Sequence, residues 1–233
     1  MLIAIEGIDA SGKHTQAHLL KAKAQSVGLR VETLSFPRYG ETLFAKSVAD
    51  YLNGKFGSLA SVDPHLSALL YAGDRFESRS TILQLSQSYD VLILDRYVAS
   101  NLAYQAAKVD REGRQEFISW LTRIEYEIYG LPRADLTVYL DIPAEIASKM
   151  IYERKRQSYN TEVADIHERE PQYLSVCREV YLLLASMNYC STWLSIQCSR
   201  PDGQMREALE ICDSIWDGIK HNMSIAQSRN SSA

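Results

Sequence analysis

The chain has 233 residues, 46% hydrophobic and 23% charged, and its 11 glycines and 6 prolines are too few for a collagen-like or low-complexity protein. Twenty-five basic and 29 acidic side chains give a net charge of -4, which argues against a surface devoted to nucleic acid or to an anionic membrane. At this length a single domain buries well over half of the surface that its unfolded chain exposes. We therefore expect one folded domain that needs neither a metal ion nor a disulfide as a staple.

The cysteine pattern and the N-terminus both predict a cytoplasmic protein. Cys177, Cys190, Cys198 and Cys212 form no C-x-x-C pair and have no histidine at metal-ligand spacing, so we expect reduced, apolar side chains. The first residues lack the basic region of a signal peptide, and no apolar run approaches the ~18 residues that span a bilayer.

Short apolar runs alternate with longer amphipathic stretches along the chain, which is typical of βαβ units around a parallel sheet. Buried strands are predicted at 2–5, 30–35, 91–94, 136–140 and 193–197. Helices are predicted at 13–26, 42–52, 64–88, 99–108, 114–129, 143–156, 171–187 and 204–219. The predicted fold is therefore α/β, with a five-stranded parallel sheet flanked by helices.

Two segments break this alternation. The stretch at about 154–167 is polar, begins Arg154-Lys155-Arg156, and shows neither a helical nor a strand period, so we interpret it as a flap. The polar tail at 221–233 is expected to be disordered and to carry no chemistry. The folded domain is thus predicted to span 1–220.

A phosphate-binding loop is predicted between the first strand and the first helix. The residues Gly7-Ile8-Asp9-Ala10-Ser11-Gly12-Lys13 fit G-x-x-x-x-G-K in the required strand-to-helix setting. Backbone N–H groups and the helix N-terminus favour a polyphosphate there, and Lys13 adds a positive charge. The alternative is an ordinary glycine-containing turn in which Lys13 is a solvated helix residue.

This loop departs from the motif at one position. His14 stands where Ser or Thr usually reaches Mg²⁺, and Thr15 follows one place later. Because Mg²⁺ prefers oxygen ligands, we expect carboxylates to hold it, from Asp9, Asp95 and Glu168. His14 is expected only to line the phosphate pocket.

A second cluster follows the third predicted strand, which ends in Asp95-Arg96-Tyr97. Ligands of open α/β sheets bind outside the carboxyl ends of the strands. There Asp95 is placed to orient a metal-bound water and Arg96 to clamp a phosphate. A surface salt bridge at the strand end is the alternative.

Four segments carry a resemblance to a known family: residues 7–15, Phe36-Pro37-Arg38-Tyr39, the segment 95–97 with 100–104, and the basic flap. Over residues 1–170 the chain resembles the thymidylate kinase family in its actinobacterial form. The resemblance implies the P-loop nucleoside monophosphate kinase architecture, with 154–167 as the LID flap. It also implies Mg²⁺-assisted transfer of the γ-phosphoryl group of ATP to dTMP, giving dTDP for dTTP synthesis. Relatives are homodimers, so we expect dTMP, ATP and a second copy as partners, without nucleic acid or membrane.

The resemblance assigns roles to individual side chains. Tyr71 is expected to stack on thymine, Arg75 and Asn101 to contact its edge, and Tyr104 to lie under the deoxyribose. The residues expected to bind dTMP are Asp9, Phe36, Arg38, Tyr39, Tyr71, Arg75, Arg96, Ser100, Asn101, Tyr104 and Asp165. Those expected to bind ATP are Gly7, Ile8, Asp9, Ala10, Ser11, Gly12, Lys13, His14, Thr15, Arg154 and Arg156.

Catalysis of phosphoryl transfer rests on alignment and on neutralising negative charge. We expect Lys13, Arg96, Arg154 and Asp9 to be catalytic, with Arg154 ahead of Arg156 as the transition-state cation. Lys155 is expected to be a solvated charge.

Two other functions remain open at this point. One is a kinase for another nucleoside monophosphate or for a deoxynucleoside. The other is a nucleotide-dependent switch or binding module, because a phosphate loop by itself establishes only nucleotide binding.

Overall fold

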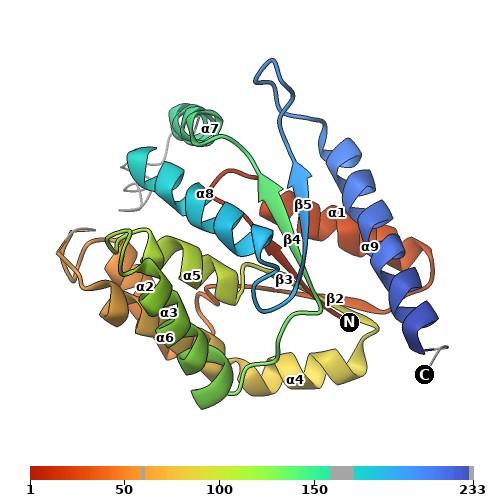
Figure 1. Cartoon of the computed structure of the whole chain (residues 1–233), viewed down its shortest axis with the longest axis horizontal. Helices are drawn as coiled ribbons and strands as arrows, with labels where there is room; N and C mark the ends of the chain where they lie inside the picture. Colours follow the sequence, from red (N-terminus) through yellow and green to blue (C-terminus); the bar gives the residue numbers. More distant parts are fainter. Residues whose placement is uncertain (59–60, 158–170, 231–233) are drawn as a thin grey trace.

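The computed structural model describes residues 1–58, 61–157 and 171–230. Its five strands form one parallel sheet in the order β2-β3-β1-β4-β5 (Figure 1). The strands are β1 (Leu2–Glu6), β2 (Val31–Ser35), β3 (Val91–Asp95), β4 (Leu136–Asp141) and β5 (Thr192–Gln197). The predicted strands and the α/β fold class are confirmed.

The strand register brings the functional loops to one edge of the sheet. In the register, Asp95 of β3 pairs with Ile5 of β1 on one side and with Ser35 of β2 on the other. Because all strands run in the same direction, the segments that follow β1, β2 and β3 emerge together. The phosphate loop, residues 36–39 and Arg96 are therefore neighbours.

Helices cover both faces of the sheet. They are α1 (Lys13–Ser26), α2 (Leu43–Leu52), α3 (Pro64–Glu77), α4 (Arg79–Ser88), α5 (Val98–Ala106), α6 (Arg114–Thr122), the π-helix η1 (Arg123–Ile128), α7 (Ala144–Gln157), α8 (Pro171–Ser186) and α9 (Ala208–Asn230). Helices α1 and α9 pack together on one face (Figure 1). Helices α5 and α8 contact each other on the opposite face, with α3 beside α5.

Three predicted helices differ from those observed. The helix expected at 64–88 is two helices that meet at Ser78, whose hydroxyl donates to Asp74 O at 2.8 Å. The helix expected at 114–129 widens into η1 after Thr122. The helix expected at 204–219 is α9, which begins at Ala208 and runs to Asn230, and the segment after 220 contains no Gly or Pro that would end a helix.

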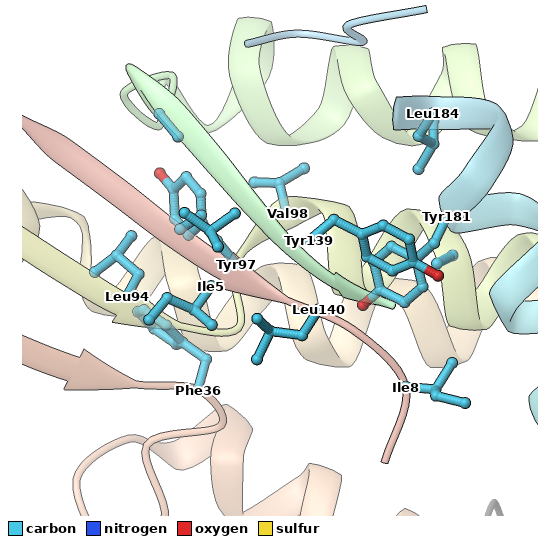
Figure 2. Close-up of a cluster of buried hydrophobic side chains, with 14 of the residues drawn as sticks. Ile5, Ile8, Phe36, Leu94, Tyr97, Val98, Tyr139, Leu140, Tyr181 and Leu184 are labelled. Atoms are coloured by element: carbon cyan, nitrogen blue, oxygen red, sulfur yellow. The ribbon is translucent and has the colours of Figure 1, made fainter. Parts of the chain in front are cut away.

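The core fills both sides of the sheet: Tyr139 of β4 packs against α8 on one side, and Leu20 of α1 and Ile215 of α9 are buried on the other. Figure 2 shows part of this cluster, with Tyr139 beside Tyr181 and Leu140 beside Ile5. The rings of Tyr139 and Tyr181 stack there with centroids 5.2 Å apart. This packing fixes β1 and β4, and with them the start of the phosphate loop.

All four cysteines are free thiols, and Cys177, Cys198 and Cys212 are buried. Across the described helices, none combines the length and apolar character that crossing a membrane requires.

Candidate active site

The phosphate loop joins β1 to α1, as the motif predicts. Gly7 has φ +150°, and a Cβ there would lie 2.7 Å from Leu140 O. Gly12 has φ +88° and stands at the N-cap of α1. Both positions therefore require glycine, one for space and conformation and the other for conformation alone.

Lys13 is buried inside this loop. Its Nζ donates to Ile8 O at 2.8 Å and to Ser11 Oγ at 3.4 Å. The pKa of Lys13 is lowered to about 7, mainly by burial and also by the nearby Arg96 charge, although Asp9 and Asp95 partly oppose this shift. The ammonium group thus lacks a full counter-charge, which the phosphates of a nucleotide would supply.

Arg96 stands directly across from the loop. Its Nη2 forms an ion pair with Asp9, and its Nη1 donates to Ser100 Oγ at 3.3 Å and to Gly7 O at 3.4 Å. The guanidinium carbon lies 5.2 Å from the centre of the Tyr104 ring. Arg96 is therefore part of a built site, and the alternative of a surface salt bridge does not describe it.

A cavity of about 330 Å³ extends from Arg96 and Asp9 between β2, α3 and α5. Its lining consists of Asp9, Ser35, Phe36, Pro37, Tyr39, Leu52, Tyr71, Arg75, Arg96, Ser100, Asn101, Tyr104 and Gln105. Most residues that the sequence predicted for substrate binding thus meet around one space of the right scale for a small ligand.

Arg38 was also expected in this wall, but it is absent from the cavity lining. Its Nη1 donates to Ser78 Oγ at 3.2 Å, and its Nη2 lies 3.5 Å from Glu41 Oε2. The backbone N–H of Arg38 donates to Asp74 at 3.0 Å. Ser78 and Glu41 thus hold the Arg38 side chain away from the cavity.

Most of the segment predicted as the LID flap, 154–167, lies outside the described residues. Asp165 and Glu168 fall in that part of the chain. Arg154 and Arg156 belong to the last turn of α7, and their side chains are likewise outside the description.

Sequence reasoning missed Gln105, Leu52, Ser35 and Pro37, which also line the cavity. Gln105 follows Asn101 by four positions on α5, so the helical period contained a signal for it. Ser35 and Pro37 flank the predicted Phe36, and only the folded loop shows that their atoms face the same space.

The far end of the cavity is a buried polar cluster. The guanidinium of Arg75 forms a two-point ion pair with Glu125, in which Nε donates to Oε2 at 2.8 Å. Asn101 Nδ2 donates to Glu125 Oε1 at 2.8 Å and to Ala68 O at 3.0 Å. Asn101 Oδ1 and Gln105 Nε2 are buried and have no hydrogen-bond partner among the described residues. Unpaired buried polar atoms are costly, so these two atoms indicate where a polar ligand binds.

Two of the three expected metal ligands lie near the phosphate loop. Asp95 Oδ2 is 3.6 Å from His14 Nδ1, while Asp9 faces Arg96. Over the described residues, no three His, Cys, Asp or Glu side chains gather in a group able to hold a metal ion. Mg²⁺ is commonly bound by one or two carboxylates together with substrate phosphates, so Asp9 and Asp95 fit that use.

Comparisons with known proteins agree with this geometry. The family model described as thymidylate kinase matches residues 5–207, beyond the 1–170 over which the motifs carry the resemblance. Thymidylate kinase of Mycobacterium tuberculosis (strain ATCC 25618 / H37Rv) is 37% identical over 209 residues, covering 90% of this chain and 97% of the relative. A probable thymidylate kinase of Archaeoglobus fulgidus is 29% identical over 224 residues, covering 95% of this chain and 99% of the relative.

A solved structure of thymidylate kinase from Candida albicans superposes with a TM-score of 0.72 at 25% identity. The match covers 95% of this chain and 92% of the other. With the phosphate loop, the Asp9–Arg96 pair and the adjoining cavity all in place, the chain belongs to the thymidylate kinase family.

Proposed function

We propose that the protein transfers the γ-phosphoryl group of ATP to dTMP, with dTMP in the cavity and the ATP phosphates in the phosphate loop. The observation that carries this proposal is the Asp9–Arg96 pair, which lies where the cavity meets the loop. An acceptor phosphate held by Arg96 there faces a donor phosphate held by Lys13. Such end-to-end alignment is the main requirement of phosphoryl transfer.

The cavity is suited to a nucleotide with its base pointing away from the loop. Arg75, Asn101 and Gln105 present polar atoms at the far end, and Tyr71 offers an aromatic face along the wall. Tyr104 lies beneath Arg96, between the base end and the phosphate end. We assign Tyr71, Arg75, Asn101 and Gln105 to the base, Tyr104 to the deoxyribose and Arg96 to the acceptor phosphate.

In the reaction, an oxygen of the dTMP phosphate attacks the γ-phosphorus, and the bond from that phosphorus to the β-phosphate oxygen breaks, releasing ADP. Lys13 and Arg96 neutralise the charge that spreads over the transferred group. We propose Arg154 as a further cation at this step, with Arg156 second. Mg²⁺ held by Asp9, Asp95 and Glu168 would neutralise part of the phosphate charge when bound.

A panel of monophosphates tests this proposal. ADP release from ATP and Mg²⁺ is measured alone and with dTMP, dUMP, dCMP or UMP. We expect dTMP to raise ADP release far above the ATP-only rate and to exceed the other three acceptors. A slow rate that dTMP leaves unchanged would instead identify a nucleotide-dependent switch, and a larger response to another acceptor would identify a different kinase.

We propose two further properties, a homodimer and a cytoplasmic location. Large apolar side chains are exposed on neighbouring elements, including Leu43 and Phe44 on α2, Phe76 on α3 and Ile128 on η1. Large apolar side chains that stay exposed on neighbouring elements are typical of subunit interfaces. The free thiols are the form that a reducing compartment maintains.

A further inference from the structure

We propose that Glu125 is a specificity-determining positioning residue, because it fixes the Asn101 amide so that the site accepts a pyrimidine carrying N–H at ring position 3. This inference rests on the proposed function, since it assumes that the cavity binds a nucleoside monophosphate. Glu125 is absent from the cavity lining, so it acts through the residues that it holds.

Glu125 is completely buried in the π-helical segment η1, whereas its neighbours Arg123 and Glu127 are largely exposed. A buried carboxylate is costly unless it is paired and hydrogen-bonded. Arg75 provides the opposite charge, and Asn101 Nδ2 provides a further donor at 2.8 Å. Both oxygens of Glu125 are thus used by groups that line the cavity.

The orientation of the Asn101 amide follows from the chemistry of its partners. The Glu125 carboxylate, ionised in its pair with Arg75, can only accept a hydrogen bond, and so can the carbonyl of Ala68. The nitrogen of the amide must therefore face these two oxygens. Asn101 Oδ1 consequently points away from them, and it is buried without a partner among the described residues.

An acceptor fixed at this place discriminates between bases. Thymine and uracil carry a proton on N3, which can be donated to Asn101 Oδ1. Cytosine has a lone pair on N3, so two acceptors would face each other in a buried site. A site built to hydrogen-bond a substrate group strongly rejects analogues that lack it, because its own polar atom is then left unpaired.

The test replaces Glu125 by glutamine. The introduced amide oxygen can still accept from Arg75, but its NH₂ group then faces Asn101 and favours the reversed Asn101 orientation. For the wild type, Glu125→Gln and the matched control Glu127→Gln, kcat/KM is measured with dTMP and with dCMP. We expect the dTMP/dCMP ratio to fall about tenfold or more in Glu125→Gln and to stay unchanged in the control. An unchanged ratio in both variants would overturn the inference.

A double-mutant cycle tests whether Glu125 acts through Asn101. In an Asn101→Ala background, Glu125→Gln should change the ratio by less than about twofold, because the amide that Glu125 orients is gone. An equal fall in both backgrounds would refute the role in orienting Asn101. A general loss of folding lowers turnover of both substrates and leaves their ratio unaffected.

If Glu125→Gln does not fold, Glu125→Asp provides the answer because it retains an acceptor-only carboxylate. We expect its dTMP/dCMP ratio to remain within about threefold of wild type even if KM for dTMP rises. Loss of the preference with the carboxylate retained would overturn the inference. The wild-type panel separates the two proposals, because a wild type that does not phosphorylate dTMP refutes the function, whatever the variants show.

Discussion

At the scale of single residues, the site concentrates buried charges that the fold only partly compensates. Lys13 is the clearest case, since burial lowers its pKa to about 7 and its hydrogen bonds go to neutral oxygens of its own loop. Arg96 differs because Asp9 already provides an opposite charge. A bound polyphosphate therefore supplies opposite charge that Lys13 lacks more than Arg96 does.

This difference predicts proton uptake on nucleotide binding. In the free protein at pH 8, Lys13 is mostly neutral because its pKa of about 7 lies below that pH. Phosphates favour the charged form and raise the pKa, so binding of ADP at pH 8 should take up close to one proton, and affinity should fall by up to about tenfold per pH unit above pH 7. Below the free pKa, at pH 6, Lys13 is already charged and contributes little uptake.

Calorimetry of ADP binding in buffers with different ionisation enthalpies measures this uptake. Lys13→Met serves as the control, since any uptake that it retains comes from ADP or from other groups. Equal uptake at pH 8 in the wild type and the control would show that Lys13 does not change its protonation.

At the scale of elements, one helix and one loop position most of the site. Helix α5 places Ser100, Asn101, Tyr104 and Gln105 on one face through its 3.6-residue period. Its start is held by Glu6 at the end of β1, which accepts from Tyr97 N at 2.7 Å and from Ser100 Oγ at 2.6 Å. Because Gly7 follows Glu6 directly, the same strand end anchors both the cavity helix and the phosphate loop.

The close packing at the start of that loop predicts that two glycine substitutions affect ADP binding differently. Gly7→Ala would place a Cβ 2.7 Å from Leu140 O, so the loop must shift, and we expect ADP affinity to fall by about a hundredfold or more. Gly28→Ala meets no atom within 4 Å and is strained only by its φ of +87°. It should reduce the free energy of unfolding by about 1 kcal/mol without changing ADP affinity. ADP titration and thermal unfolding of both variants make the comparison, and normal ADP binding by Gly7→Ala would contradict the assigned loop packing.

At the scale of the whole molecule, the strand order brings together residues from distant parts of the chain. Since β3 pairs with both β1 and β2, Asp9, Phe36 and Arg96 meet at one sheet edge. Helices α2 and α3 close the opposite side of the cavity, and Phe44 of α2 packs against Gly73 of α3. Leu43 of α2 and Phe76 of α3 are exposed, and we expect the second copy to cover them.

The proposed homodimer gives a prediction at this scale. Leu43 on α2 is 77% exposed, and Leu43→Glu would place a charge in the proposed interface. We expect sedimentation velocity to show a dimer for the wild type and at least about tenfold weaker association for the variant. Leu209→Glu on α9 is the matched control, because Leu209 is 67% exposed on a different helix. Equal effects of the two substitutions would place the interface elsewhere, and a monomeric wild type would refute the homodimer.

The sequence by itself determined the parallel sheet, the phosphate loop and most of the residues around the cavity. These features depend on local patterns, such as the apolar strands, the G-x-x-x-x-G-K spacing and the residues that follow β2 and β3. The structure places these segments together because parallel strands end at a common edge. Helix α9 runs beyond the expected end at 219, since a polar segment without Gly or Pro can still continue a helix.

Only the tertiary structure decided where individual side chains point and which residues hold them. Arg38 turns to Ser78 and Glu41, although its neighbour Phe36 lines the cavity. No sequence motif marks Glu125. Its proposed role depends on contacts with Arg75 and Asn101, which are 50 and 24 positions away in the chain. The physical reason is that a side chain's direction and charge partner depend on elements that meet only after folding, whereas strand pattern and loop chemistry are encoded by adjacent residues.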